Sequence, residues 1–369
     1  MSWNAWARQE LGELHERNLL RRCVAFDGCG PAGVVRGQEV VSFASNDYLG
    51  LAAHPHVRRA AIAAVEKFGT GALAARLVVG TRSLHENLEA ALARWKDAER
   101  ALVFPSGYAT NIGVLTALGH AGATLFSDAL NHASIIDGCR LARAAVQVFR
   151  HGDLDHLAGL LAATAGPKIV VTETVFSMDG DRIDIAALTT LCARHEALLV
   201  LDEAHDVFEV PHGPYSYGSA EILRVGTLSK TLGALGGFVA GPRSLIDLIE
   251  NRARTFIFTT GLSPADAAAA LAALEIVMNE EGDALRARLR RHVDSIRPQH
   301  PSPILPIILG SEARALGAAA ALFANGLYVP AIRPPTVPPG TARLRVTLSA
   351  IHTEAMVERL REALSEIHR

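Results

Sequence analysis

Residues 221–241 read EILRVGTLSKTLGALGGFVAG, and this stretch decides the fold. It begins and ends with short apolar runs that predict two buried β-strands. Between them, Lys230 stands among glycines and small hydroxyl residues, with Thr227 and Ser229 just before it. Most lysines are solvated surface charges, but glycines let a backbone approach a ligand closely. Hydroxyls, free amides and one amine together suit a ligand that carries a phosphate and an aldehyde.

Similar apolar runs alternate with helical patterns from about residue 85 onward. The other strands are expected at RALVF (100–104), ATLFS (123–127), AVQVFR (145–150), KIVVTE (168–173) and ALLVLD (197–202). Runs that are apolar on consecutive residues indicate strands buried on both faces, as in a mostly parallel sheet covered by helices. The sequence therefore predicts an α/β fold whose ligand binds beyond the carboxyl ends of the strands.

Three segments are expected along the chain. Residues 1–45 would form an N-terminal amphipathic helix and arm, because the charged start lacks the apolar core of a signal peptide. Residues 46–240 would form the large domain. Residues 241–369, with an Ala-rich helical tract and later strands and helices, would form a smaller α+β domain.

Composition excludes several classes of function. The net charge is −2, with 36 basic and 38 acidic side chains, so we expect no nucleic-acid partner and no anionic membrane surface. No apolar stretch is long enough to span a bilayer. The four cysteines form no C-x-x-C pair or zinc-like spacing, which favours reduced thiols in a cytoplasmic protein. A small-molecule ligand is expected.

The segment LDEAH (201–205) places Asp202 at the end of a predicted strand. A helicase would also need an upstream phosphate-binding loop of the G-x-x-x-x-G-K-[ST] type, which the sequence lacks. Metal binding by Asp202 and His205 lacks an evident third ligand, so we expect no metal. Asp202 and Lys230 can instead serve pyridoxal phosphate (PLP), which needs a lysine for its aldehyde and a carboxylate facing its ring nitrogen.

The phosphate of such a ligand needs a further element. Ser106, Gly107 and Tyr108 follow a predicted strand and open a helix, where free amides and the helix dipole favour an anion. Thr227 and Ser229 could donate hydroxyl hydrogens from the other side. An ordinary helix cap is an equally good interpretation of Ser106 and Gly107 alone.

Two more residues stand at strand ends. His132, in NHAS, lies at a strand-to-helix junction, where its ring could stack on a flat ligand or simply cap the helix. Ser177 follows the strand 168–173, and the Asp-Gly turn after it predicts a tight loop at the same sheet edge.

Taken together, eight motifs resemble the α-oxoamine synthases, PLP enzymes of fold type I related to aspartate aminotransferase. They are SNDYLGL (45–51), GTGALAARLVVGTRSLHENLE (69–89), SGYATN (106–111), NHAS (131–134), ETVFSMDGD (173–181), LDEAH (201–205), GTLSKTLG (226–233) and AIRPPTVPPGTARLRVTLSAIH (331–352). Their order and spacing match over nearly the whole chain.

The resemblance implies a homodimer with a shared active site and assigns the cofactor contacts. Lys230 would hold the aldehyde, Asp202 would face the ring nitrogen and His132 would stack on the ring. His205 and Ser177 would lie near the phenolic oxygen. The remaining contacts would be the backbone amides of Gly107 and Tyr108, and Thr227 at the phosphate.

The substrate contacts are also implied by resemblance. Segment 331–345 most resembles members that join L-alanine to a pimeloyl thioester, of coenzyme A or a carrier protein, with loss of CO2. Arg345 would bind the amino acid's carboxylate. Arg21, Thr336 and Arg333 would bind substrate, with Arg22 as an alternative to Arg21. Residues 206–218, DVFEVPHGPYSYG, depart from the family's usual glycine-rich continuation.

Other interpretations remain open. A member that uses glycine and another acyl thioester, such as a 2-amino-3-ketobutyrate ligase, differs in specificity by one methyl group of the amino acid. A nicotinamide dehydrogenase could be argued from GTGALA (69–74), but the preceding residues predict a helix where that fingerprint needs a strand. A non-catalytic PLP-binding regulator would need an appended interaction module.

Overall fold

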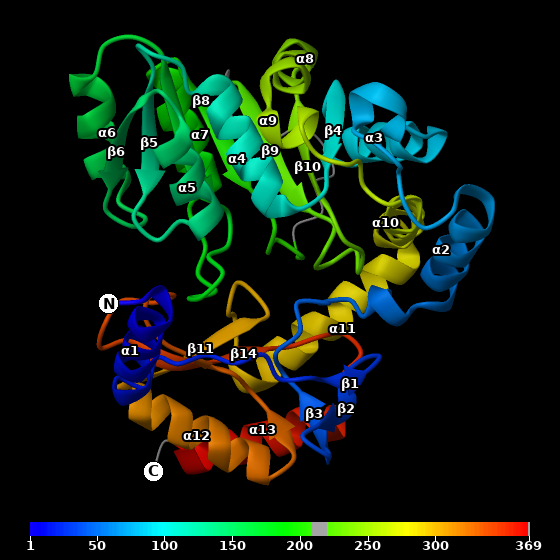
Figure 1. Cartoon of the computed structure of the whole chain (residues 1–369), viewed down its shortest axis with the longest axis vertical. Helices are drawn as coiled ribbons and strands as arrows, with labels where there is room; N and C mark the ends of the chain where they lie inside the picture. The colour runs from blue at the N-terminus through cyan, green and yellow to red at the C-terminus, as the bar shows by residue number, and fades with distance from the viewer. Residues whose placement is uncertain (209–219, 368–369) are drawn as a thin grey trace. The chain divides into compact units, whose positions relative to one another are not determined.

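The computed structural model describes residues 1–208 and 220–367, which form two compact units (Figure 1). The large unit comprises Leu49–Ser177 and Asp181–Ala287. The small unit comprises Met1–Tyr48, Met178–Gly180 and Arg288–Arg369. These units differ from the expected segments, because residues 241–287 group with the large unit and the N-terminal arm groups with the C-terminal part.

A seven-stranded sheet in the order β4-β10-β9-β8-β7-β5-β6 forms the centre of the large unit. Its strands are β4 (Arg100–Phe104), β5 (Thr124–Asp128), β6 (Ala145–Phe149), β7 (Lys168–Glu173), β8 (Ala197–Asp202), β9 (Ile222–Thr227) and β10 (Gly237–Gly241). Strands β5 to β9 pair in parallel, and β10 runs antiparallel to both of its neighbours. The predicted α/β fold with a mostly parallel sheet is confirmed.

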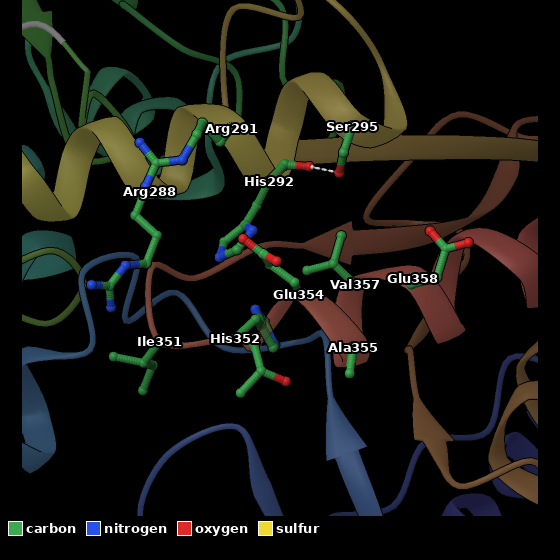
Figure 2. Close-up of a pocket in the computed structure, with 11 residues that line it drawn as sticks. Arg288, Arg291, His292, Ser295, Ile351, His352, Glu354, Ala355, Val357 and Glu358 are labelled. Carbon is green, nitrogen blue, oxygen red and sulfur yellow. Dashed lines mark hydrogen bonds between the residues drawn. The ribbon is translucent and has the colours of Figure 1, made fainter.

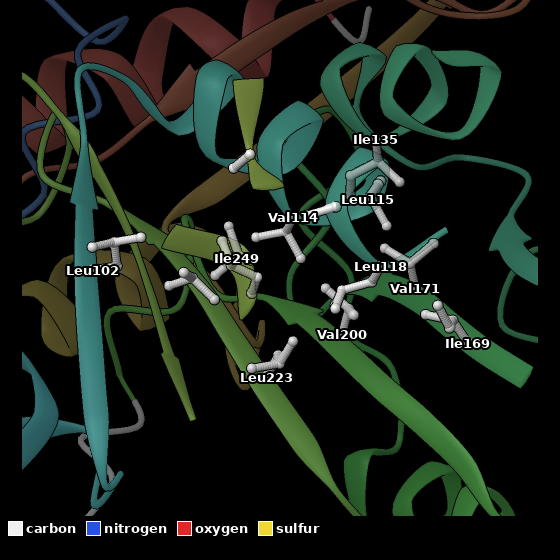
Figure 3. Close-up of a cluster of buried hydrophobic side chains, with 14 of the residues drawn as sticks. Leu102, Val114, Leu115, Leu118, Ile135, Ile169, Val171, Val200, Leu223 and Ile249 are labelled. Atoms are coloured by element: carbon white, nitrogen blue, oxygen red, sulfur yellow. The ribbon is translucent and has the colours of Figure 1, made fainter. Parts of the chain in front are cut away.

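Both faces of the central strands are buried, as their apolar runs predict. Val171 and Val200 enter one core cluster with the inner faces of α4, α5, α8 and α9 (Figure 3). Their neighbours Val170 and Leu199 enter a second cluster, which contains residues of α6 and α7. These helices are α4 (Gly107–Leu118), α5 (Ala133–Leu141), α6 (Leu154–Ala163), α7 (Ile185–Arg194), α8 (Arg243–Arg252) and α9 (Arg254–Ile257).

The prediction of two buried faces is wrong for β6. Val146 is 43% exposed and Val148 is 59% exposed, because β6 is the edge strand and pairs only with β5 among the described strands.

Besides the first half of α11 (Glu280–Ile296), three helices and two short helical turns complete the large unit. They are α2 (Pro55–Phe68), α3 (Ser83–Trp95), α10 (Pro264–Val277), the 3₁₀ turn η1 (Leu51–Ala53) and the π-helical turn η2 (Arg76–Gly80). Helix α10 packs against α2 and α3 through buried small residues, including Ala267, Ala270 and Ala273. This packing draws 241–287 into the large unit. Since α2 ends directly before 69–74, the strand that a dehydrogenase fingerprint requires is absent there.

The small unit contains two sheets. One has the order β1-β2-β3-β12 and the other the order β11-β14-β13. The strands are β1 (Asp27–Gly28), β2 (Ala32–Val35), β3 (Gln38–Ser42), β11 (Ile304–Gly310), β12 (Leu327–Tyr328), β13 (Ala331–Ile332) and β14 (Ala342–Thr347). The helices are α1 (Trp3–Glu16), α12 (Glu312–Ala324), α13 (Glu354–Ile367) and the second half of α11 (Glu280–Ile296).

The expected N-terminal helix is present as α1, which is capped by the Ser2 side chain and buries none of its own residues. Within the described ranges, we find no helix whose length and apolar character would allow it to cross a membrane.

Candidate active site

The carboxyl ends of five strands meet at one edge of the large sheet. Because β10 is antiparallel to both β4 and β9, strand β4 points the same way as β9, β8, β7 and β5. These strands end at Phe104, Thr227, Asp202, Glu173 and Asp128 respectively. Polar residues that are scattered over more than 100 positions of the sequence are therefore gathered at one edge.

Asp202 is buried, and both of its carboxylate oxygens accept hydrogen bonds. Asn111, on α4, donates its side-chain amide to Oδ2 at 2.7 Å, and the backbone amide of Ala204 donates to Oδ1 at 3.0 Å. The Asn111 amide also donates to the Ser134 hydroxyl at 2.9 Å. These donors fix the orientation of the Asp202 carboxylate.

Lys230 and His205 form a second pair in the large unit. The lysine Nζ lies 2.8 Å from Nε2 of His205, and the imidazole is 4% exposed. Lys230 follows β9, whereas His205 follows β8, so the parallel pairing of these strands brings the two side chains together. An amine and an imidazole at this distance can exchange a proton.

His132 begins helix α5 and is held through its backbone. Its amide donates to Oε1 of Glu173 at 2.7 Å, and its ring Nδ1 lies 2.8 Å from the Ser134 hydroxyl. The Ser177 backbone also hydrogen-bonds to the Glu173 carboxylate. Glu173 therefore positions two of the residues that the sequence predicts as cofactor contacts.

The carboxyl group of Glu173 lies beside that of Asp202, because the two residues are paired in register on β7 and β8. Burial is the main cause that raises the pKa of Glu173, to about 8, and the charge of Asp202 raises it further. Desolvation lowers the pKa of His132, and the charge of Lys230 acts in the same direction while that of Asp202 opposes it. The edge thus contains a carboxyl group, that of Glu173, which is protonated near neutral pH.

The start of helix α4 forms a cradle with the end of β9. The Ser106 hydroxyl caps the helix by accepting from the Ala109 amide at 3.1 Å. A Cβ placed on Gly107 would lie 3.4 Å from Cβ and 3.5 Å from Oγ1 of Thr227. A Cβ on Gly237 would lie 2.6 Å from the Gly107 amide nitrogen, so only glycine fits there. The Thr227 hydroxyl accepts from the Ser229 amide at 3.1 Å.

This cradle suits an anion, because the first amides of α4 lack internal acceptors and carry the positive end of the helix dipole. Tyr108 is 45% exposed, and its hydroxyl donates to Asp137 at 2.5 Å. The Tyr108 ring is consequently anchored on the helix surface, beside the Gly107 backbone.

The predicted substrate residues lie in the small unit. Arg345 is buried on β14, where its guanidinium donates to Asn46 Oδ1 at 3.2 Å and to the Thr347 hydroxyl at 2.9 Å. Burial raises the pKa of Tyr48 to about 12. The positive charge of Arg345 and its hydrogen bond to Tyr48 act in the opposite direction. The oxygen atoms of Asn46 and Thr347 thus help to orient the Arg345 guanidinium.

Arg21 and Arg333 are brought together. Arg21 donates to the carbonyl oxygens of Pro334 at 2.7 Å and Arg333 at 3.2 Å, and Arg333 donates to the carbonyl oxygen of Asn18. Both arginines line a cavity of about 940 Å³ that Arg22 also reaches. Thr336 belongs to the adjacent loop, where its amide donates to Arg333 at 3.2 Å.

A comparison with protein-family models shows which family the chain belongs to. The model described as aminotransferase class I and II matches residues 38–364. The chain belongs to this family.

Similarity to individual proteins shows which branch of the family the chain belongs to. The chain is 49% identical to the 8-amino-7-oxononanoate synthase of Anaeromyxobacter dehalogenans, over 98% of this chain and 95% of the relative. A structure of serine palmitoyltransferase (SPT) with PLP superposes with a TM-score of 0.91 at 29% identity, covering 99% of this chain and 97% of SPT. The 8-amino-7-oxononanoate synthase of Francisella tularensis gives a TM-score of 0.73 at 25% identity, with coverages of 89% and 96%. Within the aminotransferase family, the chain is therefore an α-oxoamine synthase.

The residues at the large sheet's edge fit the cofactor of this family. An anion cradle, an amine next to an imidazole, and a buried carboxylate with fixed orientation correspond to the phosphate, aldehyde and ring nitrogen of PLP. Among the described residues, no cluster of histidine, cysteine and acidic side chains could hold a metal ion.

Sequence reasoning missed Glu173 and Asn111. Both lie inside quoted motifs, but their roles depend on which strands and helices are neighbours. The spacing of Asn111, four positions after Gly107 on one helix, is the signal that could have found it. Part of the unusual segment 206–218 lies outside the described residues; within the described part, Asp206 accepts from Arg182 at 3.0 Å.

Proposed function

We propose that the chain condenses L-alanine with a pimeloyl thioester to give 8-amino-7-oxononanoate, CO2 and a free thiol, a reaction of biotin biosynthesis. The observation that carries this proposal is the 49% identity to an 8-amino-7-oxononanoate synthase over 98% of the chain. The convergence of Lys230, Asp202 and His132 at one sheet edge supports a PLP enzyme in particular.

The large unit would hold PLP through the residues described above. Lys230 would bind the aldehyde, Asp202 would pair with the ring nitrogen and His132 would stack on the ring. Ser177 and His205 would contact the phenolic oxygen. The phosphate would bind Thr227 and the backbone amides of Gly107 and Tyr108. When bound, PLP supplies an electron sink that stabilises negative charge at the amino acid's Cα.

Lys230 would also act as the base that removes the Cα proton of L-alanine. Its Nζ lies 2.8 Å from Nε2 of His205, so the imidazole can accept or return that proton. Asp202 would keep the ring nitrogen protonated, because the two donors from Asn111 and Ala204 hold its side chain in a fixed orientation at the sheet edge.

Arg345 would bind the carboxylate of L-alanine. Its guanidinium is buried and oriented by Asn46 and Thr347, which leaves a charged donor group of fixed geometry. A guanidinium can engage a carboxylate through two parallel hydrogen bonds. That grip would orient the bond that is broken.

The cavity lined by Arg21, Arg22 and Arg333 suits the acyl donor. Its wall includes the apolar side chains of Leu316, Phe323 and Val329. A pimeloyl chain is apolar along its length and ends in a carboxylate, so an apolar wall with arginines is complementary to it. Thr336, in the loop next to Arg333, would contact the same substrate.

A homodimer in the cytoplasm completes the proposal. Four apolar side chains near η2 are more than half exposed, at Leu73, Leu77, Val78 and Val79. Several exposed apolar side chains close together in the sequence are typical of a protein interface. All four cysteines are free thiols, in keeping with a reducing compartment.

The proposal is tested with purified protein, L-alanine and pimeloyl-CoA. We expect release of one CO2 and one free thiol per amino ketone formed, and an adduct of PLP on Lys230 after borohydride reduction. Pimeloyl-carrier protein in a parallel assay identifies the natural thioester. Faster turnover with glycine than with L-alanine would instead assign a glycine-using member of the family, and absence of an adduct on Lys230 would refute the cofactor site.

A further inference from the structure

A cavity of about 740 Å³ lies in the small unit, between the end of α11 and the start of α13 (Figure 2). Its charges favour neither an anion nor a cation, because two arginines and two glutamates share the lining. They are Arg288, Arg291, Glu354 and Glu358. A more specific arrangement lies in the large unit, where His151 stands between two carboxylates.

His151 lies two residues beyond the end of β6, and its imidazole bridges two aspartates. Its Nδ1 lies 2.9 Å from Oδ1 of Asp128, and its Nε2 lies 2.8 Å from Oδ2 of Asp181. Hydrogen bonds to Asp128 and Asp181 raise the pKa of His151 to about 10, although burial opposes them. At neutral pH the ring is therefore a cation that donates from both nitrogens.

Asp128 fixes one side of this bridge to the central sheet. It is the last residue of β5 and is 1% exposed. Its carboxylate also accepts the Leu130 amide at 2.8 Å and the Gly152 amide at 3.0 Å. Because Gly152 directly follows His151, both the backbone and the ring of this segment are attached to β5.

Asp181, on the other side of the bridge, belongs to the loop that carries Ser177. The Phe176 amide donates to the Asp181 carbonyl oxygen at 3.0 Å, so the two arms of this loop are paired. The His151 ring also packs edge-to-face against Phe176, with ring centroids 4.3 Å apart and an interplanar angle of 83°. His151 thus contacts both Asp181 and the residue directly before Ser177.

The loop is attached to the sheet at a second point, because the Ser177 backbone hydrogen-bonds to the Glu173 carboxylate on β7. Strands β7 and β5 are neighbours in the sheet, so the two attachments restrain the loop from adjacent strands. A side chain that contacts a ligand must be held in a narrow range of positions, and the residues behind it supply that restraint.

We propose that His151 is a positioning residue, which acts through Asp181 and Phe176 to hold Ser177 against the cofactor. This inference rests on the proposed contact between Ser177 and the phenolic oxygen of PLP. His151 would therefore contribute to cofactor binding as well as to the stability of the fold.

Arg100 provides a matched control for a purely structural role. Its guanidinium also lies between two carboxylates, those of Asp247 and Glu250. The Arg100 side chain is 24% exposed and that of His151 is 27% exposed. Arg100 begins β4, so it lies at the edge of the sheet opposite to the candidate active site.

The test is a double-mutant cycle on PLP affinity. The PLP dissociation constant of the full chain is measured by fluorescence titration for the wild-type protein, His151→Gln, Ser177→Ala and the double variant. Glutamine keeps one N–H donor but cannot bridge both carboxylates. We expect each single variant to weaken PLP binding about tenfold, the effect of one lost hydrogen bond. In the Ser177→Ala background, His151→Gln should have no further effect, because the hydroxyl that it positions is gone.

The absorption spectrum of the bound cofactor, recorded over a range of pH, is the second readout, because the phenolic oxygen is part of the chromophore. The pH midpoint of the spectral change should move in the same direction in His151→Gln and Ser177→Ala. Arg100→Gln should change neither the PLP affinity nor this midpoint. Thermal unfolding shows whether each variant is folded. Asp181→Asn should reproduce the effect of His151→Gln, and it replaces that variant in the cycle if His151→Gln does not fold.

Wild-type PLP affinity in folded His151→Gln, or in Ser177→Ala, overturns the proposal. So does an effect of His151→Gln that persists undiminished in the Ser177→Ala background, which would be the behaviour of a purely structural ion pair. Absence of a PLP adduct on Lys230 refutes the proposed cofactor site and this inference with it. A chain that binds PLP and gives the expected cycle, but does not condense L-alanine with pimeloyl-CoA, refutes the proposed reaction and supports the positioning role.

Discussion

Replacing Glu173 with glutamine tests whether this buried carboxyl group is protonated at the cofactor edge. Glu173 is 2% exposed, has a pKa raised to about 8, and accepts the His132 amide at 2.7 Å. Glutamine is close to glutamic acid in size and keeps a carbonyl oxygen for that amide. Near pH 7, where the native carboxyl is mostly protonated, we expect Glu173→Gln to be folded and to turn over substrate within a few-fold of the wild-type rate.

The magnitude follows from the pKa. In the unfolded chain, the Glu173 carboxyl ionises around 4.5, whereas in the folded protein it ionises at about 8. The native state therefore binds the proton more tightly, and the stabilisation associated with it is complete below pH 4.5 and disappears as the pH rises through about 8. The full difference is on the order of 5 kcal/mol, at 1.36 kcal/mol for each pH unit. Glutamine does not titrate, so the variant lacks this dependence.

The assay compares the thermal unfolding midpoints of the wild-type protein and Glu173→Gln over this pH range. The variant should gain relative to the wild-type protein as the pH rises from 4.5 toward 8, and the difference should then level off. Glu173→Ala serves as the second variant, because it leaves the amide of His132 without its acceptor and should lower turnover at every pH. A midpoint difference that stays constant, or that shrinks with rising pH, would show that Glu173 is ionised throughout.

Three other predictions concern neighbouring parts of the large unit. Asp202→Asn should lower kcat by about 100-fold or more without unfolding the protein. The asparagine NH2 group would have to face either the Asn111 amide or the Ala204 amide, which now both donate to the carboxylate. Steady-state turnover measures the effect, and thermal unfolding checks that the variant is folded. Lys96→Met should destabilise the protein by about 3–5 kcal/mol, because Glu203 would remain buried without the lysine that lies 2.6 Å away, and Arg224 lies farther off, at 3.8 Å. Arg361→Gln, in an exposed pair, should leave stability almost unchanged. Both effects are measured by denaturant unfolding. His151 lies 2.9 Å from Asp128 and 2.8 Å from Asp181, and these carboxylates raise its pKa to about 10. The stability advantage of the wild-type protein over His151→Gln should therefore be complete below pH 6.5 and vanish as the pH rises through about 10. Unfolding midpoints of the two proteins that diverge with rising pH would contradict this prediction.

Much of the fold could be predicted because it follows from local pattern. Consecutive apolar residues such as Val170 and Val171 are required wherever both faces of a strand are covered. The same pattern cannot tell a central strand from an edge strand, which is why the burial of β6 was predicted wrongly. Helix α10 belongs to the large unit because it packs against α2, about 200 residues earlier in the chain. Contacts between residues so far apart cannot be predicted from local sequence pattern.

In the candidate site, too, some features follow from local sequence and others depend on tertiary contacts. The position of Asp202 and Lys230 at the sheet edge could be predicted, because Asp202 ends one apolar strand and Lys230 follows another by three residues. Their roles stay a prediction. Glu173 also ends such a strand, but its effect on the site depends on its pairing with Asp202, which follows from the order of the strands.

The ion pair between Lys96 and Glu203 has a consequence for how this enzyme can vary. Successive residues of an extended chain point to opposite sides, so Glu203 pairs with Lys96 while Asp202 faces the candidate active site. A shift of the β8 register by one residue would leave Lys96 buried without Glu203 and would also displace the Asp202 carboxylate. The pair with Lys96 therefore holds the chain next to Asp202 in place independently of the residues beyond His205.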